Sequence, residues 1–310
     1  MVSVRPAGPA FFPLDEELAL LPGRLTPRLQ EALVRLSTHI PSFAKAATEL
    51  AWFTGTVVHA DTARRQTEAA GALLVAQETA EAQHILQAYP TPPAGPTTLV
   101  LSVDGAMIPL VHGQWTEVRT LAVGEVLALP APPDSPTLHT TNLSYFSRRT
   151  DSTTFADQAL VELHRRGLET ATRVGAVVDG AEWCQQFIDL HAPTAVRILD
   201  FAHAAEYVSA MGQALGPAGP LLGANDRARL LHDLKHAGPD GVLAELRTLV
   251  AMHPTLPELA KRLAYLEKRV AQLQYPEFQR DGWPIGSGIV ESANKLVVEA
   301  RLKGAGMHWA

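Results

Sequence analysis

The chain has 310 residues, 46% of them hydrophobic, and its 26 Lys and Arg against 32 Asp and Glu give a formal charge of -6. This length supports one large α/β domain plus a small accessory domain, and no apolar run approaches the roughly 20 residues that a membrane-spanning helix needs. Its single cysteine, Cys184, excludes a disulfide framework and a cysteine-cluster zinc site within the chain. The N-terminus has no signal-peptide core, so the expected location is the cytoplasm, without a membrane partner.

The N-terminal part, residues 1–96, is expected to be a helical module followed by a linker. Apolar residues spaced three and four apart predict three helices between residues 26 and 89. A turn is expected at residues 53–55, and Asp61 is expected to cap the helix that follows. The proline-rich residues 90–96 predict a stiff linker and a domain boundary near residue 96.

This helical module has the layout of a helix-turn-helix. In such a module Thr62, Arg64 and Arg65 would face a DNA groove. The alternative is an ordinary pair of helices joined by a glycine turn, because residues 26–96 carry no excess of bases over acids. The sequence leaves both interpretations open.

Residues 97–203 are expected to form the first part of an α/β core. A buried strand up to Asp104, a hairpin near residue 112 and a further strand before residue 147 fit a three-strand meander. Residues 152–166 predict an amphipathic helix with a Ser or Thr cap. A helix between strands at 173–179 and 194–200 predicts a β-α-β unit. This order of elements is that of an RNase H-like mixed sheet flanked by helices.

The remaining residues are expected to be mostly helical. Residues 204–280 have no strand signal and predict a helical insertion, whereas residues 281–310 predict a glycine-rich turn and a final core helix over about 289–302. The last fifty residues carry eight Lys and Arg against five Asp and Glu, which makes this the basic end of an acidic chain.

Asp104 and Asp179 are candidate catalytic residues because each is expected to end a buried strand. Those two strands would be neighbours at the centre of the sheet, which brings the carboxylates to one edge. Such carboxylates hold Mg²⁺ or Mn²⁺, and two ions about 4 Å apart support phosphodiester chemistry. The alternative is a simple turn signal, since Asp-Gly occurs four times, at residues 104, 179, 240 and 281.

The third candidate carboxylate is Glu291, which follows the glycine-rich turn on the final helix. Glu291 and Lys295 are four residues apart and are expected to share a helix face. In a functional interpretation Glu291 binds metal, and Lys295, Arg301 and Lys303 bind DNA phosphates. In a structural interpretation Glu291 and Lys295 form an exposed ion pair.

Several segments resemble the DDE transposases of ISKra-type bacterial insertion sequences, which are relatives of the Mutator-like group. They are Ser102-Val-Asp-Gly-Ala with Trp115-Thr-Glu-Val-Arg, Val178-Asp-Gly-Ala-Glu-Trp, Ile198-Leu-Asp-Phe-Ala-His-Ala-Ala-Glu-Tyr, and Pro284-Ile-Gly-Ser-Gly-Ile-Val-Glu-Ser-Ala with Arg301-Leu-Lys-Gly-Ala-Gly-Met-His-Trp. The last is the most specific, and the resemblance extends from about residue 20 to the C-terminus. Relatives often carry a cysteine-rich zinc module and a further C-terminal helical stretch, so the chain resembles a copy shortened at both ends.

The resemblance implies that Asp104, Asp179 and Glu291 hold Mg²⁺ or Mn²⁺, as two ions, and that Asp200 and His203 form the Asp-x-x-His motif of related transposases. Asp200 is the rival second aspartate, because it too is expected to end a strand. Strand order favours Asp179, whose strand adjoins the first. His203 would orient a scissile phosphate or donate to a metal-bound carboxylate; alternatively it is buried at a helix start.

The implied activity is metal-dependent DNA cleavage and strand transfer at transposon ends, on terminal inverted repeats and target DNA. Because two DNA ends must be held, a homodimer on nucleoid DNA is expected. One alternative is an inactive DNA-binding relic or repressor, and another is a host RNase H-like nuclease. Trp183 and Trp283 are expected to pack in the core, with base stacking as the alternative, and Cys184 is expected to be a buried apolar residue.

Overall fold

A computed structural model describes residues 25–128, 138–215, 224–304 and 307–309. Contacts between residues divide the chain into two compact units. The first unit runs up to Ala80 and includes Ala300–His308, and the second is built on Glu81–Glu299. The division falls within a helix, whereas the sequence places the boundary near residue 96.

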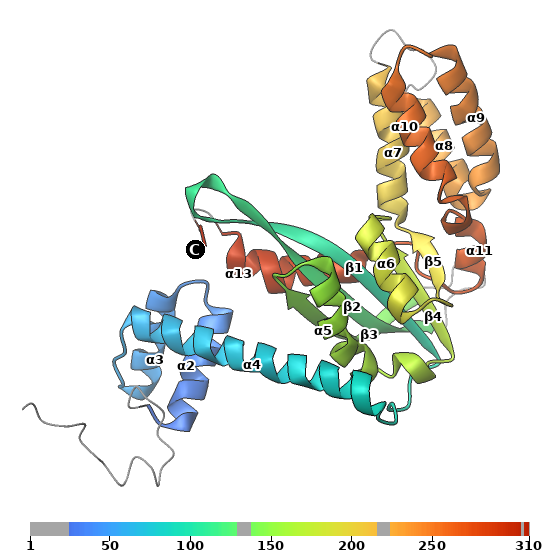
Figure 1. Cartoon of the computed structure of the whole chain (residues 1–310). Coiled ribbons are helices and arrows are strands. Elements are labelled where there is room, and N and C mark those ends of the chain that lie inside the picture. Colours follow the sequence, from blue (N-terminus) through green and yellow to red (C-terminus); the bar gives the residue numbers. More distant parts are fainter. Residues whose placement is uncertain (1–24, 129–137, 216–223, 305–306, 310) are drawn as a thin grey trace, which may run out of the picture. The chain divides into compact units, whose positions relative to one another are not determined.

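The first unit contains the three expected helices, namely α2 (Pro27–His39), α3 (Phe43–Thr54) and the first part of α4 (Ala60–Ala88) (Figure 1). Hydroxyl side chains cap α2 and α3, and Gly55 ends α3 in the left-handed conformation that glycine adopts without strain. Their small core contains Leu25, Leu33, Ala47, Leu50 and Ala63.

Two details of this module differ from the sequence prediction. The expected turn begins later, because Phe53 and Thr54 still belong to α3. Asp61 does not cap α4, because the helix already begins at Ala60 and Asp61 lies within the first turn. There its carboxylate still suits the partial positive charge of a helix N-terminus.

The second unit is built on a mixed sheet of five strands in the order β3-β2-β1-β4-β5. The first three strands form an antiparallel meander, and β4 and β5 extend it in parallel from β1. The strands are β1 (Thr98–Pro109), β2 (Trp115–Ala128), β3 (Leu138–Arg148), β4 (Arg173–Val178) and β5 (Val196–Leu199). The expected α/β class, with a mixed sheet between helices, is therefore confirmed.

Alternate residues of β1 pack into two hydrophobic cores, one on each face of the sheet. Leu99, Leu101 and Val103 pack with residues of α5 (Ser152–Arg165) and α6 (Glu182–His191). Val100 belongs instead to the core shared with the helices that follow β5. The side chain of Asp151 caps α5, so the expected Ser or Thr cap is wrong; its Oδ1 accepts from two backbone N–H groups.

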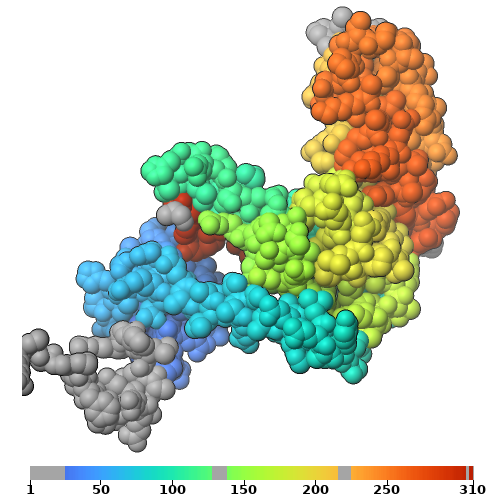
Figure 2. All heavy atoms as spheres, in the orientation of Figure 1, coloured from blue at the N-terminus to red at the C-terminus, as the bar shows by residue number. Residues whose placement is uncertain are grey.

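The expected helical insertion forms a bundle next to β4 and β5 (Figure 1). In the space-filling view it is a lobe that stands out from the sheet (Figure 2). Leucines dominate its core. Its elements are α7 (Phe201–Ala214), α8 (Ala224–His236), α9 (Pro239–Met252), α10 (Pro257–Glu267), a 3-10 turn (Val270–Gln272) and α11 (Tyr275–Arg280).

The final helix covers the expected residues but changes its winding midway. Helix α12 (Gly288–Ala293) continues as a π-helix, η6 (Asn294–Glu299), and ends with α13 (Ala300–Leu302). Val290 and Ala293 pack against Ala122 of β2. A π-helix shifts the side chains that follow it around the axis, and such segments are frequent at functional sites. Among the described residues no helix is both long and apolar enough to cross a bilayer.

Candidate metal-binding site

The predicted catalytic residues of the second unit line one pocket of about 180 Å³. The pocket lies where the ends of β4 and β5 meet the middle of β1, the start of α7 and helix α12. Its titratable lining side chains are Asp104, Asp179, Asp200, His203, Glu206 and Glu291. No Lys or Arg is among the described residues that line it.

Asp104 lies inside β1, and the expectation that it ends the strand is wrong. The strand continues because residues up to Pro109 keep pairing with β2, as far as Trp115. The two oxygens of Asp104 accept from the backbone N–H of Gly105 at 2.7 Å and from Nδ2 of Asn294 at 2.8 Å. Burial raises the pKa of this carboxyl, and the neighbouring charges of Asp179 and Glu291 raise it further.

Asp179 directly follows β4, which pairs in parallel with β1. Its Oδ1 accepts from the backbone N–H of Ala181 at 2.8 Å and from the Cys184 thiol at 3.5 Å. Within the described residues, no hydrogen bond to its Oδ2 is found. One oxygen of Asp179 is therefore available to a ligand in the pocket.

Asp200 directly follows β5 and is only 3% exposed. Its Oδ1 caps α7 by accepting from the backbone N–H of His203 at 3.0 Å. Its Oδ2 accepts from the backbone N–H of Ser287 at 2.6 Å and from the Ser287 hydroxyl. Both oxygens are thus engaged by protein donors that join the start of α7 to the start of α12.

His203 lies on the first turn of α7, with its side chain 30% exposed at the pocket. Its Nδ1 is 3.8 Å from Glu206, one turn further along the helix. The ring lies near Tyr207 and Tyr265, with centroid distances of 5.3 and 6.2 Å. His203 is therefore partly exposed rather than buried, although its ring lies near two tyrosines of the insertion, as the structural alternative expected.

Glu291 lies on α12, one turn after Ser287, whose hydroxyl is 3.2 Å from its Oε1. The ion pair of Glu291 with Lys295, which the structural alternative expected, is not found in the described part of the chain. The winding explains this difference, because the π-helix begins between the two residues and removes the four-residue alignment of an α-helix. Lys295 itself is exposed.

The predicted DNA-contacting residues are divided between the two units. Lys295 belongs to the unit that holds the pocket, whereas Arg301 and Lys303 belong to the first unit. There Arg301 lies over the Phe43 ring, with its Cζ 5.2 Å from the ring centroid, and burial lowers its pKa. The structure therefore does not place all three cations at one site.

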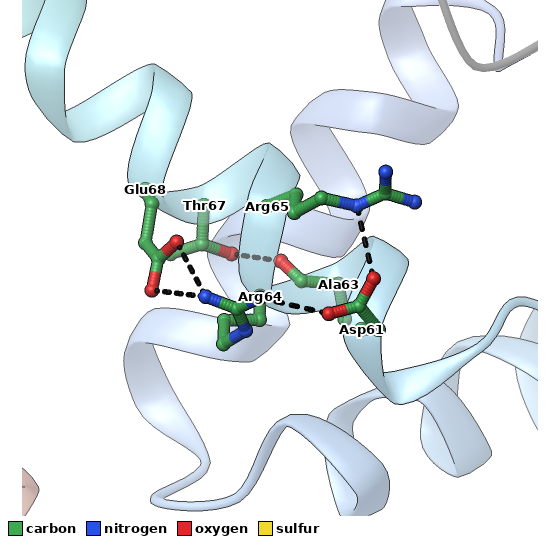
Figure 3. Close-up of polar contacts among 6 residues, drawn as sticks. All are labelled: Asp61, Ala63, Arg64, Arg65, Thr67 and Glu68. Carbon is green, nitrogen blue, oxygen red and sulfur yellow. Dashed lines mark hydrogen bonds and ion pairs between the residues drawn. The ribbon is translucent and has the colours of Figure 1, made fainter. Parts of the chain in front are cut away.

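Arg64 and Arg65 at the start of α4 are exposed and engaged in ion pairs along their own helix (Figure 3). Arg64 binds Asp61 at 2.8 Å and Glu68 at 3.0 Å, and Arg65 binds Asp61 at 3.1 Å. The hydrogen bond from Arg64 lowers the pKa of Asp61. Thr62, in the same turn, is half-buried. This surface is locally neutral, so DNA phosphates would have to displace carboxylates to bind it.

Three residues that the sequence assigns to packing are placed accordingly. Trp283 is 3% exposed and packs against Gly175 of β4. Trp183 is half-buried, with its ring 5.9 Å from that of Phe155. Cys184 is buried and free, and burial, reinforced by the charge of Asp179, raises the pKa of its thiol.

Sequence reasoning missed four side chains that shape the site. Asn294 and Ser287 could have been found from the sequence, because each lies within four residues of Glu291 on the same helical segment. Tyr265 donates to the carbonyl of Asp179 at 2.5 Å, and Arg269 donates to the carbonyl of Gly180 at 2.6 Å. Both come from the insertion, more than 80 residues along the chain, and carry no local signal.

The pocket has the ligand chemistry of a site for Mg²⁺ or Mn²⁺, which prefer carboxylate oxygens. One oxygen each of Asp179 and Glu291 accepts no hydrogen bond within the described residues, and no Lys or Arg among the described lining residues neutralises the acids. In the described side-chain arrangement, however, no group of three or more His, Cys, Asp or Glu is placed to hold a metal ion. Binding would require these side chains to rotate toward a common point.

Comparison of the sequence with protein-family models and with curated proteins finds no match of either kind.

Proposed function

We propose that this chain is a DDE-type DNA transposase that cleaves transposon ends and transfers the strands in a metal-dependent reaction. One observation carries the proposal: Asp104, Asp179 and Glu291, from three separate elements, line one pocket that has no lining Lys or Arg among the described residues. Clustered carboxylates without a counter-charge repel one another, and divalent cations relieve that repulsion.

The order and pairing of the strands support an RNase H-like core for this function. A three-strand antiparallel meander is followed by two parallel strands on the side of β1, with helices between them. Asp104 lies in β1, Asp179 directly follows the neighbouring strand β4, and α12 brings Glu291 to the same pocket. Together with the motifs around these residues, the arrangement supports membership of the ISKra-type transposases.

The predicted site residues at the pocket divide into three roles in the proposed mechanism. Asp104, Asp179 and Glu291 would hold the cations, which when bound activate the attacking water or 3′-hydroxyl and stabilise the leaving oxygen. Asp200 would act as a positioning residue, because it binds Ser287 at the start of the helix that carries Glu291. His203, exposed at the pocket, would orient the scissile phosphate.

The proposed partners are DNA and a second copy of the chain. Terminal inverted repeats and target DNA would reach the acidic pocket only with bound Mg²⁺ or Mn²⁺, since phosphates and carboxylates repel each other. Lys295, exposed in the same unit, would bind DNA phosphates. Two ends must be held for strand transfer, which is the reason to propose a homodimer on DNA.

The test is strand cleavage of the DNA that flanks the reading frame, with Mg²⁺ or Mn²⁺. We expect Asp104→Ala, Asp179→Ala and Glu291→Ala each to reduce the rate of cleavage by at least about 10³-fold. Losses of this size are found when one residue is removed from a set that acts together in catalysis. Asp240→Ala is the matched control, because it is another Asp-Gly aspartate but lies outside the pocket. DNA binding without metal-dependent cleavage by the parent chain would instead indicate an inactive relic.

A further inference from the structure

Two consecutive backbone carbonyls at the end of β4 are held by side chains from the helical insertion. The hydroxyl of Tyr265 donates to the carbonyl of Asp179 at 2.5 Å, and Nη2 of Arg269 donates to the carbonyl of Gly180 at 2.6 Å. Nη1 of Arg269 also donates to the carbonyl of Tyr265 at 3.0 Å. The turn that carries the Asp179 carboxylate is thus tied to Tyr265 of α10 and to Arg269, two residues beyond the end of that helix.

Stacking makes this connection stiff. The Cζ of Arg269 lies 3.7 Å from the centroid of the Tyr265 ring, and only 7% of Arg269 is exposed. The ring of Tyr265 stacks on that of Tyr207 of α7, with 3.9 Å between centroids and 9° between planes. Cation-π contacts are strongest where the cation is desolvated, as it is here. The two donors are therefore held in one orientation by contacts within the insertion.

The turn itself is shaped to fit these donors. Gly180 has φ of 80°, in the left-handed region that glycine adopts without strain. A Cβ at this position would lie 2.5 Å from the Tyr265 hydroxyl and 2.7 Å from Nε of Arg269. Only glycine permits both this conformation and such close approach. The Asp179-Gly180 pair therefore forms a turn and also allows the close contact of that turn with Tyr265 and Arg269.

We propose that Tyr265 and Arg269 are positioning residues that fix the Asp179–Gly180 turn and so set the place of the Asp179 carboxylate. This rests on the proposed function, in which Asp179 holds a divalent cation. Groups that orient a metal ligand commonly change metal affinity or activity by 10- to 100-fold when they are removed. The insertion, which supplies none of the proposed metal ligands, then contributes to metal binding through Asp179.

A matched control lies at the end of the neighbouring strand. The hydroxyl of Tyr275 donates to the carbonyl of Leu199, the last residue of β5, at 2.9 Å. Tyr275 is fully buried, and the residue after Leu199 is Asp200. Tyr265→Phe and Tyr275→Phe therefore remove the same chemical group at the ends of neighbouring strands, one from the carbonyl of Asp179 and one from the carbonyl of the residue before Asp200.

The experiment measures Mn²⁺ binding to the full chain without DNA, by calorimetric titration, with urea unfolding of the metal-free protein alongside. We expect Tyr265→Phe and Arg269→Gln each to weaken Mn²⁺ binding by about tenfold, as loss of an outer-shell partner does. Tyr275→Phe should leave Mn²⁺ affinity within about twofold of the parent, even where it lowers the urea midpoint. Arg269→Lys, which keeps the charge but not the forked donors, should fail to restore affinity.

The outcomes separate this proposal from the function on which it rests. If Asp179→Asn leaves Mn²⁺ binding unchanged, the proposed metal site is wrong, and the positioning role falls with it. If Asp179→Asn weakens binding but Tyr265→Phe does not, the positioning role alone is overturned. Equal losses in Tyr265→Phe and Tyr275→Phe would also overturn it, because the effect would then not be specific to the Asp179 turn.

Discussion

At the scale of single residues, the two aspartates that follow strands differ in what surrounds them. Asp200 is buried with both oxygens engaged, whereas Asp179 is half-buried and has an oxygen to which the described residues donate nothing. Three protein donors hold the Asp200 carboxylate, which leaves it less capacity for a cation than Asp179, whose Oδ1 alone accepts from the described residues. The contrast supports Asp179 as the ligand and Asp200 as a structural link.

This contrast predicts different stability costs. Asp200→Ala should lower the free energy of unfolding by about 3 kcal/mol, because it removes a helix cap and leaves buried donors of Ser287 without a partner. Asp179→Ala removes one backbone hydrogen bond and should cost about 1 kcal/mol. Urea unfolding of the metal-free protein measures both. Equal costs for the two variants would contradict the structural role of Asp200.

The burial of Asp104 predicts how the stability of the protein depends on pH. Its pKa is raised by burial, so the folded protein binds this proton more tightly than the unfolded chain does. Its contribution to stability is therefore complete below the ordinary pKa of 3.8 and is lost as the pH rises through the folded value. In EDTA at pH 7, Asp104→Asn should thus be more stable than the parent.

The same substitution should preserve the hydrogen bonds at this position. Oδ1 of Asn294 is buried without a hydrogen-bond partner in the described structure, and a flip of its amide would let it accept from the amide that the substitution introduces. Urea midpoints from pH 7 to pH 4.5 test the prediction. The advantage of the variant should shrink as the pH falls, and added Mg²⁺ should stabilise only the parent. A constant advantage at all pH values would count against the stated cause.

At the scale of elements, the succession of helices and strands could be predicted from periodicity, but some of their ends could not. Strand β1 passes Asp104 because its pairing with β2 continues, and a cross-strand partner leaves no mark on the local pattern. The π-helix was likewise unforeseen, since residues 289–302 have an ordinary helical pattern. Helix α12, from which it continues, packs on Ala122 of β2, and such tertiary contacts leave no mark on the local pattern.

Asn294, the first residue of the π-helix, is expected to orient Asp104, because its Nδ2 donates to the Asp104 carboxylate at 2.8 Å. Asn294→Ala should cost about 1 kcal/mol of stability and leave Asp104 less well oriented. We expect cleavage by this variant to need more Mg²⁺, by about tenfold. Ser292→Ala, at an exposed position on the same helix, is the control. An unchanged Mg²⁺ dependence in Asn294→Ala would show that this hydrogen bond does not serve the site.

A second prediction at this scale concerns the contact between Trp283 and β4. A Cβ on Gly175 would lie 2.6 Å from two atoms of the buried Trp283 ring, which has Arg173 stacked 4.5 Å from its centroid. Gly175→Ala should therefore destabilise the protein by about 1–3 kcal/mol through overpacking. Gly241→Ala in α9, where no neighbouring atom lies within 4 Å, should stabilise by about 0.5–1 kcal/mol. Thermal unfolding distinguishes the two, and a neutral Gly175→Ala would mean that the ring can move.

At the scale of the whole molecule, the pocket combines residues that are very distant in sequence. Asp104 and Asn294, joined by a hydrogen bond, are 190 positions apart. Strand order and the family resemblance predicted that Asp104, Asp179 and Glu291 would meet, although Asp104 lies inside its strand rather than at its end. The donors from the insertion could not be predicted, since only tertiary packing brings α10 to the end of β4.

Net charge leads to the last prediction. The chain carries a formal charge of -6, and some of its carboxylates line the pocket that DNA would approach in the proposed function. Without divalent cations, repulsion should keep binding of the flanking DNA weak. Ca²⁺ occupies carboxylate sites with more flexible geometry than Mg²⁺ does, so we expect it to support DNA binding without efficient cleavage. Millimolar Ca²⁺ should raise DNA affinity by roughly tenfold, about 1.4 kcal/mol.

Fluorescence anisotropy with labelled DNA measures this effect, and Glu291→Gln provides the specific control. This variant removes one pocket charge, so in EDTA it should bind DNA at least as well as the parent, yet it should lose most of the gain from Ca²⁺. Asp240→Asn removes a charge outside the pocket and should keep that gain. If Ca²⁺ strengthens DNA binding equally in all three proteins, the cation acts by general screening, and the carboxylate pocket is not where DNA and metal meet.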